Sequence, residues 1–393
     1  MCALLKKSAA LVLMAMLSAL YFFAMILARK TLSPEDLYFW NVLVTLMSIG
    51  FTFCFLGSEQ LFLRFSMVDE QRRVFINQNT LKIMIGSSLV FTTVITYLAE
   101  TYFFQLGNFF IYFIIFFCVG VFVFVYNILR LHRSFALAQV AANGWKLTLF
   151  ISVILAPLGD FSIIILSSLL STCIGVVVLL IKNGSVLQVN NDVMQSNWVH
   201  LYSGFFVALF VLMLLTNIDR LIFTRYGGDE LFSEYVYLTI LLILPFSILS
   251  NYLGFKEIAY LKIDYGHLNF FRRILTVGLA SASLFSLWFG LIYLGQEWLE
   301  VSIHIHYGLP CAIIVVCRCA YALLSALLGL KGSPKDIYLA NLITIMAIGL
   351  AVCMLLLVGV SILNVVLMVA GLWLVRLGVY LLYALKIKGL MAR

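Results

Sequence analysis

The apolar positions of this chain occur in long unbroken runs and not at the spaced positions of a surface helix. A helix that crosses a membrane needs about 20 mostly apolar residues, and the sequence contains twelve runs of this kind. They cover residues 8–27, 37–57, 78–99, 108–129, 136–156, 161–181, 199–223, 232–254, 273–294, 308–330, 337–359 and 361–385. The pattern predicts an all-α polytopic membrane protein with about 12 transmembrane helices.

Composition supports this class. Hydrophobic residues make up 64% of the 393 positions and charged residues 11%, against roughly 25% charged in an ordinary soluble domain. The first run follows Lys6 and Lys7, has no small-x-small cleavage site and ends before Arg29 and Lys30. We therefore interpret it as the first span and not as a signal peptide.

The basic residues predict an orientation. If the N-terminus is cytoplasmic and the spans alternate, 19 of the 25 basic residues fall on the cytoplasmic side, as the positive-inside rule expects. These are Lys6, Lys7, Arg64, Arg72, Arg73, Lys82, Arg130, Arg133, Lys146, Lys182, Lys256, Lys262, Arg272, Arg273, Lys331, Lys335, Lys386, Lys388 and Arg393. The sequence thus predicts a multi-pass protein of the cytoplasmic (cell inner) membrane with both termini in the cytoplasm. The net charge of +8 gives no reason to expect a nucleic-acid partner.

The chain divides near its middle. An Asn-rich connection at 182–198 predicts an N-terminal six-helix lobe (1–181), a cytoplasmic linker and a C-terminal six-helix lobe (199–393). Each half carries a similar stretch, "ILARKTLSPEDLYFWNVLVTLMSI" in the first and "IFTRYGGDELFSEYVYLTILLILP" in the second. Six spans in each half make both halves enter the membrane from the same side. This favours a parallel pseudo-repeat around a central cavity, an arrangement found in secondary transporters.

Three stretches carry a resemblance to a known family: "ARKTLSPEDLYFWNVL", "FLGSEQLFLRF" and "NIDRLIFTRYGGDELFSEY". They resemble the Wzx-type polysaccharide flippases of the multidrug/oligosaccharidyl-lipid/polysaccharide exporter superfamily. In that family the seventh span carries Asn-x-Asp-Arg followed by an acid and a Tyr, here Asn217, Asp219 and Arg220 with Glu234 and Tyr235.

The resemblance implies a transporter and not an enzyme, so no catalytic residue is expected. Its substrate would be a polyprenyl-pyrophosphate-linked oligosaccharide, such as an O-antigen unit, translocated across the cytoplasmic membrane by alternating access. Membrane lipids and other polysaccharide-assembly proteins are the partners that the resemblance implies.

Among the charges that interrupt the apolar runs are Asp219 and Arg220, Arg318 in "VVCRCAY" and Arg376 in "WLVRLGVY". A charge at the bilayer centre costs roughly 2.5–3.5 kcal/mol on insertion scales, and an arginine fork binds phosphate bidentately while staying charged. We expect a cationic translocation site that contains the following residues: Arg318, Arg376, Arg220, Arg29 and Arg225. The structural alternative is that the deep arginines pair with carbonyls or distant acids, and that the other arginines anchor span ends at the interface by snorkelling.

Asp219 is the candidate for proton or sodium coupling, because it is the acid that lies well inside a span. No cofactor is expected. No metal site is expected either, because Cys317 and Cys319 lack ligand spacing.

Other polytopic classes remain as alternatives. A multidrug-type exporter of the same superfamily would share the fold, but we expect acids in its cavity for cationic drugs. A polysaccharide polymerase would be expected to carry a large outer loop, whereas the outer segment around 295–307 is short. A polytopic acyltransferase would be expected to use an intramembrane histidine, and all five histidines fall in loops or at span ends. An assembly scaffold would have no cavity.

Overall fold

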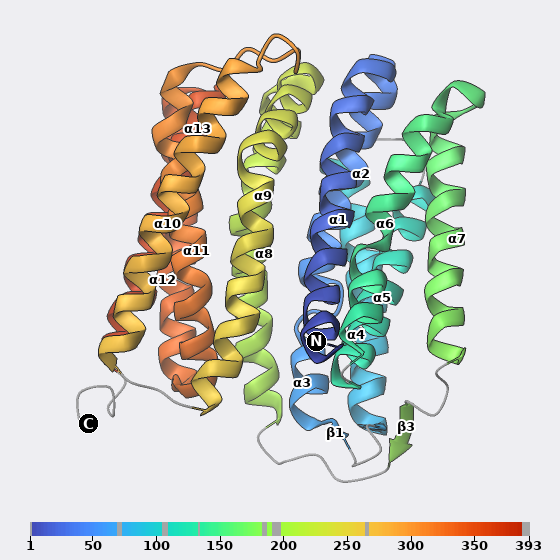
Figure 1. The fold of residues 1–393 in the computed structure, drawn as a ribbon, viewed down its shortest axis with the longest axis vertical. Coiled ribbons are helices and arrows are strands. Elements are labelled where there is room, and N and C mark those ends of the chain that lie inside the picture. Colours follow the sequence, from blue (N-terminus) through green and yellow to red (C-terminus); the bar gives the residue numbers. More distant parts are fainter. Residues whose placement is uncertain are drawn as a thin grey trace. The chain divides into compact units, whose positions relative to one another are not determined.

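The computed structural model describes residues 2–68, 73–103, 109–132, 134–182, 187–190, 198–263 and 267–386. Within these ranges, twelve helices are long and apolar enough to cross a membrane. They are α1 (Cys2–Thr31), α2 (Pro34–Phe53), α4 (Gln78–Leu98), α5 (Phe109–Leu131), α6 (Phe135–Leu155), α7 (Phe161–Lys182), α8 (Trp198–Tyr226), α9 (Gly228–Ile263), α10 (His267–Leu294), α11 (Gly308–Lys331), α12 (Pro334–Val358) and α13 (Ile362–Leu385) (Figure 1). The all-α polytopic class is confirmed, and each span lies close to its predicted range.

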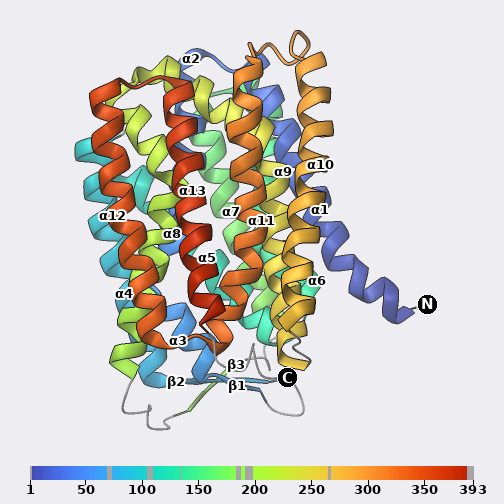
Figure 2. The same ribbon diagram turned by 90° about the vertical axis from the view of Figure 1, so that its left-hand side faces the viewer.

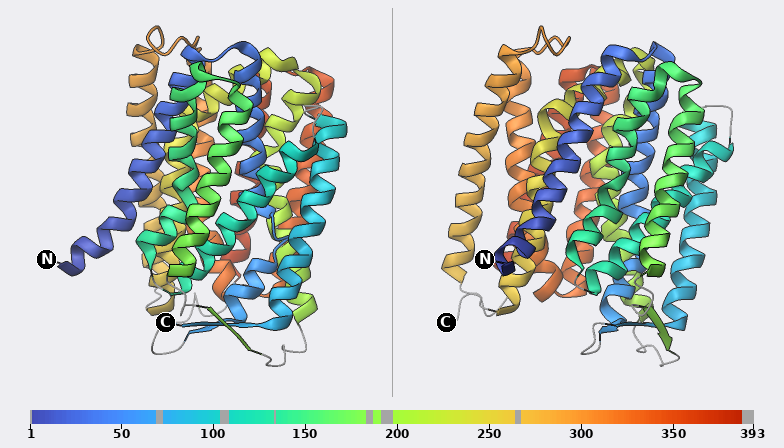
Figure 3. Two further views of the ribbon diagram at one scale, coloured as in Figure 1. Left: turned by 90° about the vertical axis from the view of Figure 1, so that its right-hand side faces the viewer. Right: turned by 45° about the vertical axis from the view of Figure 1, so that its right-hand side comes forward.

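By internal contacts the chain forms two compact units, Met1–Met213 and Leu214–Arg393. The boundary falls inside α8, so this helix contributes its first part to one unit and its last part to the other. Each unit is described separately below; within each, the helices run roughly side by side (Figure 3).

The N-terminal unit is built on helix pairs that bury large apolar side chains. Helix α1 packs along α6, and α5 packs against α2, α6 and α7. In its core, the Phe51 ring stacks on the Phe122 ring at 6.4 Å and on the Trp145 ring at 5.6 Å. Aromatic pairs of this kind stabilise the fold by more than the burial of their apolar area alone. They therefore help to fix how α2, α5 and α6 pack.

A small sheet closes one end of this unit (Figure 2). Strand β1 (Met67–Val68) pairs antiparallel with β2 (Val74–Asn77), and β2 pairs parallel with β3 (Leu187–Asn190). The register places Val74 opposite Leu187 and Asn77 opposite Asn190. Part of the predicted 182–198 linker is thus a strand that attaches to the N-terminal unit.

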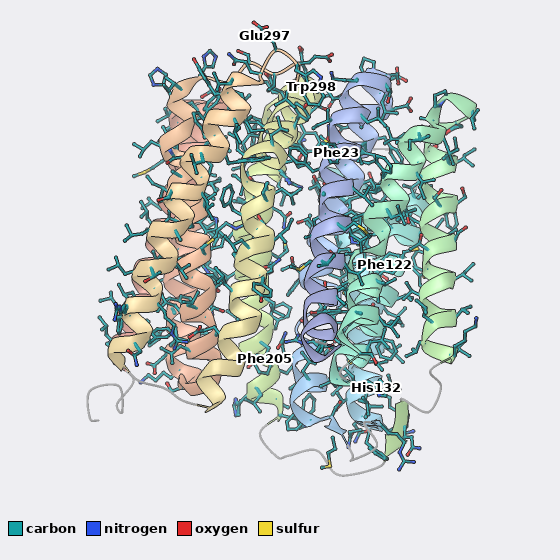
Figure 4. All side chains as sticks on the ribbon, in the orientation of Figure 1. Phe23, Phe122, His132, Phe205, Glu297 and Trp298 are labelled. Atoms are coloured by element: carbon teal, nitrogen blue, oxygen red, sulfur yellow. The ribbon has the colours of Figure 1, made fainter. Side chains whose placement is uncertain are left out.

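In the C-terminal unit, α11 is the central helix. It packs against α9, α10 and α13, and α12 packs against α13. The hydroxyl of Tyr237 donates to the carbonyl of Leu299 at 2.8 Å, which ties α9 to the α10–α11 connection. Glu297 and Trp298 lie in that connection (Figure 4). Helix α9 continues through Pro245 without a break in its helical assignment.

Two helices begin with the same local design. In "SPED" and "SPKD" the serine is the N-cap, the proline begins the helix, and the serine hydroxyl accepts from the backbone N–H of Asp36 or Asp336. The hydroxyl satisfies one of the N–H groups that a helix start leaves unpaired, and proline has no N–H to satisfy there. The sequence therefore fixes where α2 and α12 start.

Two details of the sequence analysis are wrong. The second span does not run to residue 57, because α2 ends at Phe53 and a turn leads into the short helix α3 (Ser58–Phe65). Lys146 does not belong with the residues of the cytoplasmic side. It is a buried residue of α6, about 17 Å from either end of the span Phe135–Leu158 at 1.5 Å per residue. The excess of basic residues on one side persists without it.

Candidate functional site

The charged motif near the end of α8 is a hydrogen-bonded unit. Asp219 is 8% exposed. Its Oδ2 accepts a hydrogen bond from the Tyr235 hydroxyl at 2.6 Å, and its Oδ1 accepts one from the backbone N–H of Arg220 at 2.9 Å. The Phe223 ring packs on the Tyr235 ring at 4.5 Å. Asp219 and Tyr235 both belong to the stretch that carries the family resemblance, and their bond joins α8 to α9.

Arg318 of α11 lies near this motif. The charges of Arg318 and Arg220 both act on the Asp219 carboxylate. Arg318 is half-buried, and its guanidinium carbon lies 5.3 Å from the centroid of the Trp373 ring, a cation–π contact. Among the described residues, Arg318 makes no salt bridge or side-chain hydrogen bond. No acceptor in the described part of the chain engages its five N–H donors.

Arg376 of α13 has different surroundings. It is 1% exposed, and it donates to the hydroxyl of Tyr321 at 2.7 Å and of Tyr380 at 3.4 Å, and to Oδ1 of Asn341 at 3.3 Å. The rings of Tyr321 and Tyr380 also lie 4.7 and 4.9 Å from the guanidinium carbon. These partners come from α11, α12 and α13, so Arg376 links three helices. No carboxylate pairs with it among the described residues.

Depth separates these charges. At 1.5 Å per residue, Arg318 lies about 15 Å from the end of its span at Leu328 and Arg376 about 14 Å from Leu385, whereas Asp219 lies about 10 Å from Tyr226. A hydrocarbon core is about 30 Å thick. Both deep arginines are therefore near mid-depth, where a charge is most costly.

The structure brings together part of the predicted set. Asp219, Arg220, Arg318 and Arg376 belong to one unit, and electrostatic or ring contacts connect them through Trp373 and Tyr321. Arg225 is exposed in the last turn of α8, a position suited to an interfacial anchor. Arg29 is half-buried in the last turn of α1. A substrate contact by any of these residues stays a prediction.

Lys146 is a buried charged residue whose depth the sequence analysis missed. Its Nζ donates to the Ser18 hydroxyl of α1 at 2.9 Å, and the Trp145 ring lies 5.9 Å away. Among the described residues, no carboxylate pairs with this ammonium group. The signal was present in the sequence, because Lys146 lies in the middle of an apolar run and a charge there is costly. The sequence analysis assigned Lys146 to one side of the membrane and so did not consider its depth within the span.

The described residues contain no group of three or more His, Cys, Asp and Glu that could hold a metal ion. The candidate site of the C-terminal unit is therefore a set of arginines, tyrosines and a tryptophan around one aspartate.

The fold and this set of residues define the class: a polytopic α-helical membrane protein with cationic side chains at mid-depth in its spans. The chain is similar in structure to "Lipid II flippase MurJ, inward closed conformation", with a TM-score of 0.65 and 15% sequence identity, over 96% of this chain and 87% of that chain. At this identity the similarity shows the fold. No model of a known protein family matches the sequence, and no curated protein matches it.

Proposed function

We propose that this protein is a flippase that moves a lipid-linked anionic saccharide precursor across the cytoplasmic membrane. Arg318 carries the proposal: it is a half-buried arginine near mid-depth with no ion-pair partner among the described residues. The cost of such a charge is offset if its ligand is an anion that must itself reach mid-depth. The structural similarity to a lipid II flippase supports the same class of substrate.

A pyrophosphate-linked lipid presents the required chemistry. Its acyl chain stays in hydrocarbon while its charged head group crosses a core about 30 Å thick. The planar guanidinium of Arg318 offers two parallel N–H donors to phosphate oxygens, and Arg220 adds a second positive charge near Asp219. The contacts of Arg376 with Tyr321 hold α11 and α13 together, and so help to keep Arg318 in place.

The finer substrate assignment rests on the motif. The seventh-span sequence resembles that of Wzx-type flippases, so the proposed substrate is an oligosaccharide on a polyprenyl pyrophosphate, such as an O-antigen unit. The proposal includes alternating access, a location in the cell inner membrane with cytoplasmic termini, and partners among the polysaccharide-assembly proteins. A multidrug-type exporter is the alternative, and Asp219 would then be its cation-binding acid.

Binding to the purified full-length protein tests the proposal. The probes are a polyprenyl-pyrophosphate oligosaccharide, a lipid of the same length with a neutral head group, and a hydrophobic organic cation. We expect at least tenfold tighter binding of the pyrophosphate lipid than of the neutral lipid.

Variants then test the role of Arg318. Arg318→Ala should abolish most of this preference, and Arg318→Lys should retain part of it, because lysine keeps the charge but loses the fork. Arg272→Ala is the matched control, since Arg272 is exposed near the start of α10. Tight binding of the cation, without preference for the anionic lipid, would contradict the proposal and favour an exporter.

A further inference from the structure

The helix of the second span breaks before it reaches the end of the unit. Between α2 and α3, Leu56 and Gly57 have φ values of 51° and 88°, both in the left-handed region. A Cβ atom at position 57 would lie 2.8 Å from the backbone nitrogen of Phe206 and 3.0 Å from the carbonyl carbon of Phe205. The break is therefore seated directly on the backbone of α8, where Phe205 lies close to α3 (Figure 4).

Glu59 lies in the first turn of α3, immediately after this break. Its side chain is only 9% exposed, and its buried Oε2 atom has no hydrogen-bond partner. A buried carboxylate needs a partner to offset the loss of hydration. Among the described residues, no group pairs with Oε2, and the carboxyl receives hydrogen bonds only from the Gln60 side chain and the local backbone.

Among the residues whose side chains the structure describes, none forms an ion pair with the Glu59 carboxyl. The titratable side chains described on the neighbouring elements at this end include Cys54 on α2, Arg73 beside β2, Lys82 on α4, Tyr126 and Arg130 on α5, and His200 and Tyr202 on α8. Lys82 and His200 are exposed, Arg130 lies over the Tyr126 ring, and the Tyr202 hydroxyl bonds to Ser87.

Burial dominates the titration of both acids at this break. Burial raises the pKa of Glu59 to about 7, and hydrogen bonds from Gln60 and the local backbone oppose this only in part. Burial and the nearby Glu59 carboxylate raise the pKa of Cys54 well above its usual value. Cys54 therefore stays a neutral thiol, and Glu59 is the group whose charge changes near neutral pH.

Asp219 is as buried as Glu59, at 8% exposed, but its carboxylate has partners. Both of its carboxylate oxygens accept hydrogen bonds, and two arginine charges act on it. Hydrogen bonds and opposite charges favour the charged form of a carboxylate, and the Oε2 atom of Glu59 has no such partner among the described residues.

We propose that Glu59 is the proton-binding group of the transport cycle, protonated while the α2–α3 break encloses it and deprotonated when the break opens to water. Oε2 takes its proton from the aqueous phase and returns it there, so the step needs no other reactant. The inference rests on the proposed transport function and adds to it the residue that responds to a proton gradient. It replaces Asp219 in that role.

A titration without substrate tests proton binding directly. In infrared spectra of the purified full-length protein, the band of a protonated carboxyl that disappears in Glu59→Gln should titrate near pH 7. Glu297→Gln, at an exposed position, should leave this band in place. Titration of the Glu59 band at the ordinary glutamate pKa of about 4.5 would overturn the inference.

Vesicles that contain the protein test coupling. With a lipid-linked oligosaccharide, an imposed pH gradient should raise the flipping rate of the wild type and of Glu297→Gln by the same factor. For Glu59→Gln the ratio of rates with and without the gradient should be one, and for Asp219→Asn the ratio should match the wild type. A gradient response that persists in Glu59→Gln would overturn the inference, as would a flipping wild type with no response. Failure of the wild type to flip any lipid would instead contradict the proposed function.

Discussion

Arg318 and Arg376 lie at similar depth but in different surroundings. Arg376 has acceptors on both of its terminal nitrogens and is shielded from solvent. Arg318 has a tryptophan face and the field of Asp219, but no hydrogen-bond acceptor among the described residues. Buried polar groups in a folded protein normally have hydrogen-bond partners. We therefore expect Arg376 to stabilise the fold and Arg318 to contact the proposed ligand.

Replacing each arginine by glutamine should separate the two roles. Arg376→Gln removes charged hydrogen bonds to Tyr321 and Asn341 and should destabilise the protein by about 2–3 kcal/mol. Arg318→Gln should leave the midpoint of thermal unfolding within a degree or two of the wild type and still lose binding of the anionic lipid. Thermal unfolding in detergent measures the first effect. An Arg376→Gln protein as stable as the wild type would contradict this assignment.

Glu59 predicts how stability depends on pH. Because its pKa is raised to about 7 in the folded protein, the folded state binds the proton more tightly than the unfolded state. Its contribution is fully present below the unfolded value of about 4.5 and is lost as pH rises to about 7, a change of about 3 kcal/mol. The midpoint of thermal unfolding should fall across this window, and Glu59→Gln should flatten the fall relative to Glu297→Gln. The same pH dependence of the unfolding midpoint in Glu59→Gln and Glu297→Gln would contradict the raised pKa of Glu59.

At the scale of elements, the α2–α3 break is the feature that separates this fold from a simple row of spans. The break packs directly on the backbone of α8 because Gly57 has no side chain. Gly57→Ala would place a methyl group against the backbone of Phe205 and Phe206, which cannot rotate away, in a conformation that alanine rarely adopts. The expected cost is about 1–3 kcal/mol.

Gly86→Ala is the matched control for this change. Gly86 lies in α4 with no atom within 4 Å of an added Cβ, and alanine favours helix over glycine by about 0.8–1.0 kcal/mol. We expect Gly86→Ala to be neutral or stabilising in the same unfolding measurement. Equal changes in stability for Gly57→Ala and Gly86→Ala would contradict the close packing of Gly57 on α8.

The spans were predictable from sequence and the break was not, for a physical reason. Hydrocarbon selects length and apolarity, so runs such as 232–254 identify a helix without knowledge of its neighbours. The residues "CFLG" are as apolar as the helix before them, and only the φ values of Leu56 and Gly57 reveal the turn. The candidate site was predictable only in part. The sequence identified Arg318 and Arg376 as unusual, but the tyrosines that distinguish them come from separate helices.

At the scale of the whole molecule, the topology makes a prediction that needs no substrate. With cytoplasmic termini, reporter fusions after Lys182 and after Arg393 should report the cytoplasm, and a fusion at Gly228, between α8 and α9, should report the outside. The turn at Gly227 and Gly228 places the end of α8 and the start of α9 together. A cytoplasmic signal at Gly228 would contradict the orientation, and with it the side from which Arg220 would meet the substrate.

Flipping by the purified protein tests the central claim most directly. Vesicles would carry a fluorescent polyprenyl-pyrophosphate oligosaccharide in both leaflets, and a membrane-impermeant quencher added outside would report the fraction that it reaches. Without protein the quencher should reach about half of the lipid. The account predicts that the wild type and Arg272→Ala bring nearly all of it within reach, that Arg318→Ala slows this at least tenfold, and that a neutral lipid does not move. Flipping of the neutral lipid at the same rate, or quenching that stays at half in wild-type vesicles, would contradict the account.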